Sequence, residues 1–370
     1  MNTTGFNETL QYYSSFDVNG FLSSVDTLRV GESLKKEYLG ELDFLSLLSL
    51  SAAGRLEEMA FRSKEITERN FGKVISLYAP IYLSNYCENE CLYCGFNAAN
   101  RITRKRLTID ELIVEAEAVA AKGIRHVLIL TGESRKHSPV SFIKDCVGEL
   151  KRFFPSISIE VYPLKEDEYK ELAGAGVDGL ALYQETYDRF IYADLHPRGP
   201  KSDFNFRLDA PERACRAGMR GVNAGVLLGL ADFRKDVFLA GLHAKYLEKK
   251  YPSTDIGISL PRFQPEAGGF VPALQVSDTE FVQCITALRL FLPKASINIS
   301  TREDRELRGN LIGLGVTRMS AGSRTEVGGY SLRERSGEQF SIADKSTVEE
   351  VREMIISKGY QPVMKDWEAI

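Results

Sequence analysis

Short apolar runs alternate with amphipathic stretches along most of the chain, beginning at about residue 74. The runs are rich in β-branched residues, which is typical of the buried strands of a parallel sheet. They predict eight strands, at 76–83, 126–130, 156–161, 179–183, 221–227, 255–260, 296–299 and 317–319. The amphipathic stretches between them predict covering helices.

The clearest helical stretch opens with Thr108 and Glu111, which form a capping-box pattern, and it ends at Gly123. Further helices are predicted near 140–153, 166–174, 209–217, 234–248, 277–290, 303–313 and 346–358. Eight alternations of strand and helix favour the α/β class and a closed (β/α)8 barrel of the TIM type. A doubly wound open sheet is the alternative.

The two ends of the chain depart from this alternation. Residues 1–73 predict an N-terminal helical extension, with two helices within 32–70 that pack against the barrel. The barrel core is expected to cover 74–335, and 336–370 predict a C-terminal helix and tail packed on it. The segment 186–207 is long for a connection between a strand and a helix, and such loops tend to be functional.

The composition of the chain favours a globular protein over a nucleic-acid-binding or membrane protein. The chain has 44% hydrophobic and 26% charged residues and a formal net charge of −4, which fits a globular protein and indicates no nucleic-acid partner. The N-terminus lacks the basic start and apolar stretch of a signal peptide, and no segment reaches the roughly 18 apolar residues of a membrane span. We therefore expect a cytoplasmic protein without a membrane partner.

Three of the six cysteines are clustered as Cys87, Cys91 and Cys94. A structural zinc site needs four ligands, commonly two pairs, and the chain offers no second pair. Three cysteines suit a [4Fe-4S] cluster with one open iron, which can chelate a small molecule and pass it an electron. A zinc site and a chance grouping are the alternatives. The other three cysteines lie in apolar helical patterns and are read as buried hydrophobes.

Polar residues follow most of the predicted strands, where the chemistry of a barrel enzyme sits. Glu133 follows the second strand, Arg262 the sixth and Ser320 the eighth. Arg302 comes directly off the seventh strand, which favours an inward guanidinium whose planar fork suits a substrate carboxylate. We interpret Glu303 as a carboxylate at a helix N-terminus.

The cysteine spacing, with an aromatic residue just before the third cysteine, resembles the cluster motif of the radical S-adenosylmethionine (SAM) enzymes. This resemblance implies an enzyme with two cofactors, a [4Fe-4S] cluster on the three cysteines and SAM. It also implies a set of SAM-binding residues, which are Tyr93, Phe96, Thr131, Gly132, Glu133, Gln184, Glu185, Arg207 and Leu228.

The resemblance gives these residues separate roles. The run 131–133 resembles the Gly-Gly-Glu element that receives the SAM amino group, with Thr131 in place of the first glycine. Gln184 and Glu185 stand where related enzymes hold the ribose and amino groups, and Arg207 matches an arginine that pairs with the SAM carboxylate. The segment 225–229 matches the backbone that lines adenine.

Further motifs resemble the aromatic amino acid lyase branch of these enzymes. They are the runs 183–187, 196–201, 259–262, 300–303, 320–325 and 328–330. The runs 338–341 and 361–367 are similar to the tyrosine lyases that make 2-iminoacetate for thiamine, although Met364 replaces an expected tryptophan. The alternatives are the hydrogenase-maturation tyrosine lyase, a tryptophan lyase, and a non-catalytic iron-sulfur electron-transfer protein. No cysteine follows Cys284, which disfavours the first of these.

The reaction implied by this resemblance starts with reductive cleavage of SAM to methionine and a 5′-deoxyadenosyl radical. The radical takes a hydrogen from the amine of L-tyrosine, and the Cα–Cβ bond breaks to give 2-iminoacetate and p-cresol. Arg302 with Ser320 is expected to hold the tyrosine carboxylate, assisted by Arg262. The implied protein partners are thiazole synthase, which receives 2-iminoacetate, and flavodoxin or ferredoxin as electron donor.

Overall fold

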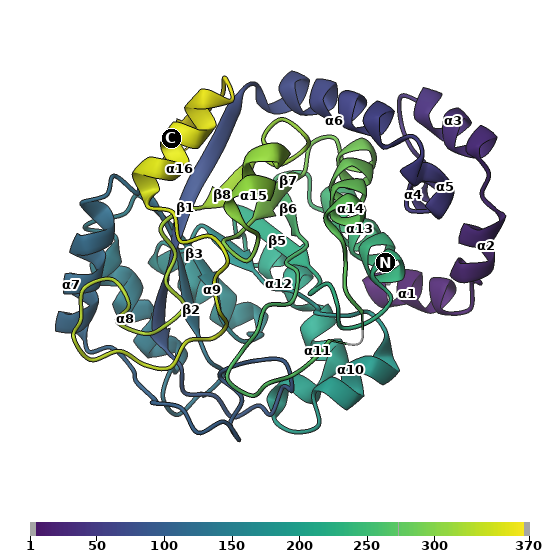
Figure 1. The fold of residues 1–370 in the computed structure, drawn as a ribbon. Helices are drawn as coiled ribbons and strands as arrows, with labels where there is room; N and C mark the ends of the chain where they lie inside the picture. The colour runs from purple at the N-terminus through teal and green to yellow at the C-terminus, as the bar shows by residue number, and fades with distance from the viewer. Residues whose placement is uncertain (1–4, 273, 366–370) are drawn as a thin grey trace.

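The structure, a computed structural model, describes residues 5–272 and 274–365. Its centre is a ring of eight parallel strands (Figure 1). The ring closes because β1 pairs with β8 on one edge and with β2 on the other. The strands are β1 (Val74–Ser84), β2 (His126–Thr131), β3 (Ser156–Glu160), β4 (Gly179–Ala181), β5 (Gly221–Gly225), β6 (Asp255–Ser259), β7 (Ser296–Ile299) and β8 (Arg318–Ser320). The predicted (β/α)8 barrel is confirmed, and the open-sheet alternative is wrong.

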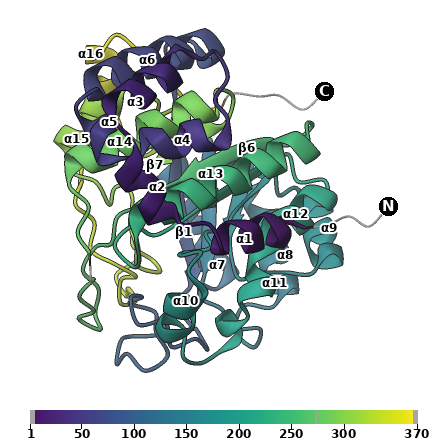
Figure 2. The ribbon, with the colours of Figure 1, turned by 90° about the vertical axis from the view of Figure 1, so that its right-hand side faces the viewer.

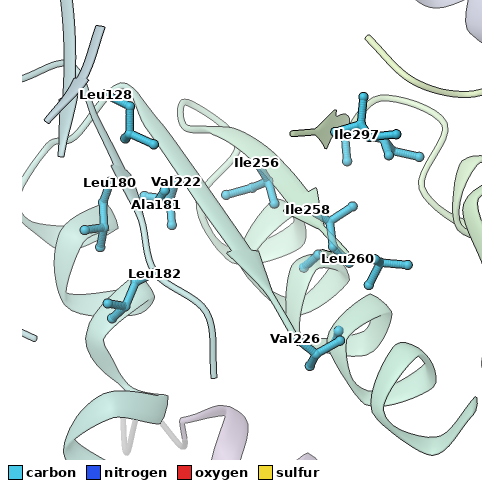
Figure 3. Close-up of a cluster of buried hydrophobic side chains, with 14 of the residues drawn as sticks. Leu128, Leu180, Ala181, Leu182, Val222, Val226, Ile256, Ile258, Leu260 and Ile297 are labelled. Carbon is cyan, nitrogen blue, oxygen red and sulfur yellow. The ribbon is translucent and has the colours of Figure 1, made fainter. Parts of the chain in front are cut away.

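Helices cover the outside of this ring (Figure 1). Each helix predicted from the barrel region is present, and they are α7 (Ile109–Ala120), α8 (Val140–Leu150), α9 (Glu166–Ala175), α12 (Ala210–Arg216), α13 (Phe233–Lys250), α14 (Asp278–Phe291), α15 (Arg305–Leu311) and α16 (Val348–Ser357). The capping box predicted for α7 forms, since Glu111 N donates to Thr108 Oγ1 at 3.2 Å and Thr108 N donates to Glu111 Oε2 at 2.9 Å. Hydrophobic residues of neighbouring strands are buried together in the core, as Figure 3 shows for β2 and β4 to β7.

The long segment after β4 folds into three short helices. They are α10 (Arg189–Leu195), a 3-10 turn at Pro200–Ser202, and α11 (Phe204–Leu208). Figure 1 shows α10 and α11 at the end of the barrel where β1 points, beside the loop that leaves β1. This segment therefore covers the C-terminal mouth of the barrel, where active sites of this fold are found.

The N-terminal extension contains more helices than the sequence pattern predicts. The expectation of two helices within 32–70 is wrong, because Gly40 and Ser49 each start a new helix at their N-cap positions. The described extension consists of α1 (Phe6–Ser14), α2 (Val18–Ser24), α3 (Thr27–Lys35), α4 (Glu41–Leu47), α5 (Leu50–Ala53) and α6 (Leu56–Phe71). It packs along α13 and α14 (Figure 2). There, the buried Gln283 amide donates to the carbonyls of Leu47 and Ser49.

A ninth strand, β9 (Gln361–Val363), extends the sheet near the C-terminus. It pairs with the first residues of β1, and Ser76 has both Val363 and Arg318 as partners. Residues 366–370, part of the predicted C-terminal tail, lie outside the described residues. Within the described part of the chain, no helix is long and apolar enough to cross a membrane.

Candidate active site

The three clustered cysteines lie in the loop that follows β1 and line one cavity at the barrel mouth, with about 650 Å³ of empty space. The loop is held by its own polar groups. Arg104 donates from its guanidinium to the carbonyl of Asn85 at 2.7 Å and to that of Phe96 at 2.9 Å, and the Asn97 amide donates to Cys91 O at 3.0 Å. A folded loop thus presents all three thiols to a single space.

Burial controls the protonation of these thiols. It raises the pKa of Cys94 to about 11, with a further contribution from Cys87, and it raises the pKa of Cys87 and Cys91 as well. All the cysteines are free. Because a metal binds the thiolate, loading of a metal group into this cavity must release protons.

The cavity is also lined by six of the residues predicted to bind SAM, which are Phe96, Thr131, Gly132, Glu133, Glu185 and Arg207. Gly132 allows the cysteine loop to pack closely, because a Cβ atom there would overlap the carbonyl oxygen of Tyr86. The Thr131 hydroxyl is buried and has no hydrogen-bond partner among the described residues, and Glu133 accepts a hydrogen bond from the Asn89 amide at 2.7 Å. The edge formed by β2 thus offers both a donor and acceptors to a polar ligand.

Glu185 and two cations form another part of the lining of this cavity. Lys201 Nζ lies 2.6 Å from Glu185 Oε1, and Arg207 Nη2 lies 3.4 Å from the same oxygen. Burial alone would raise the pKa of Glu185, but the two cations outweigh it and the net pKa is lowered. Among the described residues, Glu185 is the one non-glycine residue with a positive φ, at 74°, a strained conformation that is typical of functional sites.

Three further predicted SAM residues do not line this cavity. The Tyr93 hydroxyl lies 2.6 Å from His196 Nε2 inside a small apolar cluster beneath the cysteine loop. The Gln184 amide is directed to the carbonyl of Phe204 at 3.5 Å. Leu228 lines a separate groove formed by the loop that begins at Arg262. These three side chains thus lie outside the cavity that the cysteines line.

A second cavity adjoins the first and contains Arg302 and Ser320, with about 490 Å³ of empty space. The Arg302 guanidinium stacks on the Phe340 ring at 3.3 Å from the ring centroid. Burial lowers the pKa of Arg302, and no described carboxylate forms an ion pair with it. Ser320 Oγ accepts hydrogen bonds from Thr301 N at 3.2 Å and from the Ser323 hydroxyl at 3.1 Å. The cavity therefore holds a cation that is available to an anionic ligand.

Arg262 lies outside this cavity. Its guanidinium pairs with Glu303, with Nε 2.7 Å from Glu303 Oε2, and with Asp278 at 2.7 Å. Glu303 lies directly before Asp304, the N-cap of α15, so it is at a helix N-terminus as predicted. It is only 1% exposed and is also the buried partner of Arg262. The donors of Arg262 are thus already occupied in the substrate-free protein.

Several residues that line the site were not predicted from the sequence. Glu160 lines both cavities from the end of β3, Lys201 binds Glu185, and Gln339 and Phe340 close the mouth from the C-terminal segment. Gln339 O accepts a hydrogen bond from Gly95 N at 3.0 Å, and its side chain accepts one from the Tyr82 hydroxyl at 2.7 Å. The strand-end rule could have found Glu160. The closing segment falls in the run 338–341, which the resemblance to tyrosine lyases singled out without assigning it to the site.

Comparisons with known proteins show to which family the chain belongs. The chain is 38% identical over 341 residues to 2-iminoacetate synthase of Salmonella typhimurium, an alignment that covers 92% of this chain and 90% of that protein. The match to 2-iminoacetate synthase of Escherichia coli has the same identity and coverage. The chain belongs to the 2-iminoacetate synthase family. Within it, residues 81–237 match the Radical SAM superfamily and 259–361 match the Biotin and Thiamin Synthesis associated domain.

The fold of this 2-iminoacetate synthase family member is shared with a maturase. The FeFe-hydrogenase maturase HydG from Carboxydothermus hydrogenoformans superposes with a TM-score of 0.91 at 29% identity, covering 98% of this chain and 86% of that one. The matches to the Radical SAM superfamily and to 2-iminoacetate synthase show that the protein is a radical SAM enzyme, a class that uses a 4Fe-4S cluster and SAM.

The donor set of the first cavity fits such a cluster better than a single ion. No group of three His, Cys, Asp or Glu side chains in the described ranges is arranged to hold one metal ion. In a [4Fe-4S] cube each cysteine binds a different iron, so its three sulfurs need not converge on one point. Three thiols around a shared cavity, with polar groups left over for a ligand of the open iron, satisfy that requirement.

Proposed function

We propose that the protein is a radical SAM lyase that cleaves the Cα–Cβ bond of L-tyrosine to give 2-iminoacetate and p-cresol. The observation that carries this proposal is the pair of adjoining cavities at the barrel mouth. One presents three cysteines, and the other presents Arg302, a stacked cation that no carboxylate of the described residues pairs with. The first suits a radical-generating cofactor and the second an amino acid carboxylate.

Cys87, Cys91 and Cys94 would hold the cluster, and the reduced cluster with SAM supplies a 5′-deoxyadenosyl radical when both are bound. We assign Thr131 and Glu133, on the β2 side of the cavity, to the SAM amino group. In the same cavity, Glu185 would accept hydrogen bonds from the ribose or amino group, and Arg207 would pair with the SAM carboxylate. Gly132 and Phe96 would shape the surrounding walls, and Tyr93, Leu228 and Gln184 would act from outside the cavity, behind these walls.

In the second cavity, Arg302 and the Ser320 hydroxyl would hold the tyrosine carboxylate, and this fixes the direction in which the amine points. Since the two cavities adjoin, an amine held beside Arg302 can face the radical source, and such positioning is worth several orders of magnitude in rate. Gln339 and Phe340 line the mouth and limit the access of water. We assign Arg262 a supporting role through Glu303, which it holds in place.

The products determine what other proteins the enzyme needs. An imine hydrolyses in water, so we propose direct transfer of 2-iminoacetate to thiazole synthase for the thiazole of thiamine. The cluster also needs an electron, for which flavodoxin or ferredoxin is the proposed donor. Free thiols throughout the described chain support a reducing compartment, and we propose the cytoplasm.

The test is an anaerobic assay of the reconstituted protein with dithionite, SAM, and either tyrosine or tryptophan, with products identified by mass spectrometry. We expect 5′-deoxyadenosine, p-cresol and glyoxylate, the hydrolysis product of 2-iminoacetate, from tyrosine alone. Cys91→Ala should lose cluster binding and SAM cleavage together. Cleavage of SAM without any tyrosine product, or turnover of tryptophan instead, would overturn the substrate assignment.

A further inference from the structure

Glu160 is the last residue of β3, and its side chain lines both cavities at the barrel mouth. Among the described residues, none donates a hydrogen bond to its carboxylate. The neighbouring acid Glu185 differs in this respect, because Lys201 and Arg207 already occupy its carboxylate. Glu160 is thus the acid of the site that is left without a partner.

Two of the residues that line the second cavity carry a charge. Arg302 is the one cation and Glu160 the one carboxylate, while the other lining side chains are aromatic, aliphatic, hydroxyl or amide groups. An α-amino acid at neutral pH carries one carboxylate and one ammonium group close together. The charge pattern of the cavity is therefore complementary to a zwitterion, and an unpaired charge in such a space costs free energy until a ligand of opposite sign arrives.

The surroundings of Glu160 favour proton exchange near neutral pH. Burial raises the pKa of Glu160 to about 7, with a further contribution from Glu185, while Arg302, Arg207 and Lys201 partly offset both. The phenols of Tyr78, Tyr82 and Tyr183 also face it, and each has a raised pKa, so these phenols stay protonated. A carboxyl group in this range can accept a proton from an amine and later return it.

We propose that Glu160 binds the α-ammonium group of tyrosine and accepts one of its protons, so that the nitrogen facing the SAM cavity is a neutral amine. This inference rests on the proposed function. In this step one N–H bond breaks, its electron pair stays on nitrogen, and an O–H bond forms on Glu160. The neutral amine can then give a hydrogen atom to the 5′-deoxyadenosyl radical, which becomes 5′-deoxyadenosine. The nitrogen-centred radical that remains is neutral, whereas the same loss from an ammonium group would leave a radical cation of higher energy. The proton on Glu160 returns to solvent when the products leave.

Measurements of ligand binding can distinguish a Glu160 that binds the α-ammonium group from a Glu160 that only stabilises the fold. Reconstituted, unreduced enzyme with SAM would be titrated with L-tyrosine and with 3-(4-hydroxyphenyl)propanoate, which lacks the amine. Glu160→Gln, an isosteric change, should weaken tyrosine binding by about 10- to 100-fold and leave binding of the propanoate unchanged. Asp167→Asn, which removes an exposed carboxylate on α9, is the matched control and should bind both ligands as the parent does. Equal losses for both ligands in Glu160→Gln would overturn the proposal.

Turnover gives a second, independent measurement. At about pH 7, Glu160→Gln should form p-cresol at least about 100-fold more slowly, and its rate should recover toward pH 9 as free tyrosine loses its own proton. Glu160→Asp should retain part of the parental rate because it keeps the carboxylate. A pH-independent defect in Glu160→Gln, or a normal rate, would contradict the proposal. Parent protein that makes no p-cresol from tyrosine would instead refute the function itself.

Discussion

The unpaired guanidinium of Arg302 leads to a prediction with two parts. Arg302→Met removes the charge and keeps an unbranched side chain to pack on Phe340, which lies 3.3 Å from the guanidinium. Loss of the substrate carboxylate's buried partner should cost about 2–5 kcal/mol of tyrosine binding, equivalent to roughly 30- to 4,000-fold in Kd or KM. The free energy of unfolding of the substrate-free protein should change by no more than about 1 kcal/mol, because only a cation–π contact is lost.

Arg308→Met provides the contrast, because Arg308 is fully buried, pairs with Asp344 and donates to the carbonyl of Ser320. Its removal leaves the Asp344 carboxylate buried and unpaired, which should cost about 3–5 kcal/mol of stability. The assays are urea unfolding of the two variants and tyrosine titration of the reconstituted enzyme. If Arg302→Met unfolds as easily as Arg308→Met, or binds tyrosine as the parent does, the assignment of Arg302 to the substrate carboxylate is refuted.

Three other changes test the site and its support. Gly132→Ala should lower the iron content after anaerobic reconstitution, because the new Cβ overlaps the carbonyl of Tyr86 and displaces the cysteine loop; full iron content would contradict this packing. Arg104→Ala should likewise lower iron content by freeing the loop carbonyls, with far-ultraviolet circular dichroism unchanged. Burial raises the pKa of Asp236 from 3.8 to about 7, so the folded protein holds this proton more tightly than the unfolded chain does. The free energy of unfolding therefore contains the full contribution of the protonated carboxyl group below about pH 4, and this contribution is lost as the pH rises through 7. Asp236→Asn should therefore be more stable than the parent above pH 7, by up to about 4 kcal/mol in urea unfolding, with no difference near pH 4; a constant difference across pH would exclude this titration.

The strands of the barrel were predictable because each is buried on both faces and is bounded by polar turns, so a short apolar run identifies it without tertiary information. The N-terminal helices were not, since Gly40 and Ser49 interrupt a region whose overall composition is that of continuous helix. β9 has three residues and contains Pro362, and it exists because β1 offers a free edge beside it. The reason that β9 forms is therefore the position of β1, and not the local sequence of β9.

In the site, too, some features follow from the local sequence and others depend on distant segments of the chain. Arg262 and Arg302 both follow buried strands closely, and the sequence assigned both to the substrate carboxylate. In the structure Arg262 pairs with Glu303 and Asp278, whereas Arg302 stacks on Phe340 and faces the cavity. The partners come from other segments of the chain, so position after a strand predicts where a side chain lies but not whether its charge is available. Whether a charged side chain is free to bind a substrate therefore depends on the tertiary structure.

The strand order explains why the two charges of the second cavity can select a zwitterion. β3, which ends in Glu160, and β7, which precedes Arg302, are four strands apart in either direction around the closed ring. The carboxylate and the guanidinium therefore extend from opposite sides of the mouth, and the hydrogen-bonded barrel fixes the span between their backbones. A substrate whose adjacent ammonium and carboxylate groups are held between these two side chains must place its Cα near the barrel axis, next to the cysteine cavity. Shortening one arm, as in Glu160→Asp, changes this span by one methylene, and the charge that carries out the chemistry is retained. The loss in that variant thus measures how much of the rate depends on position alone.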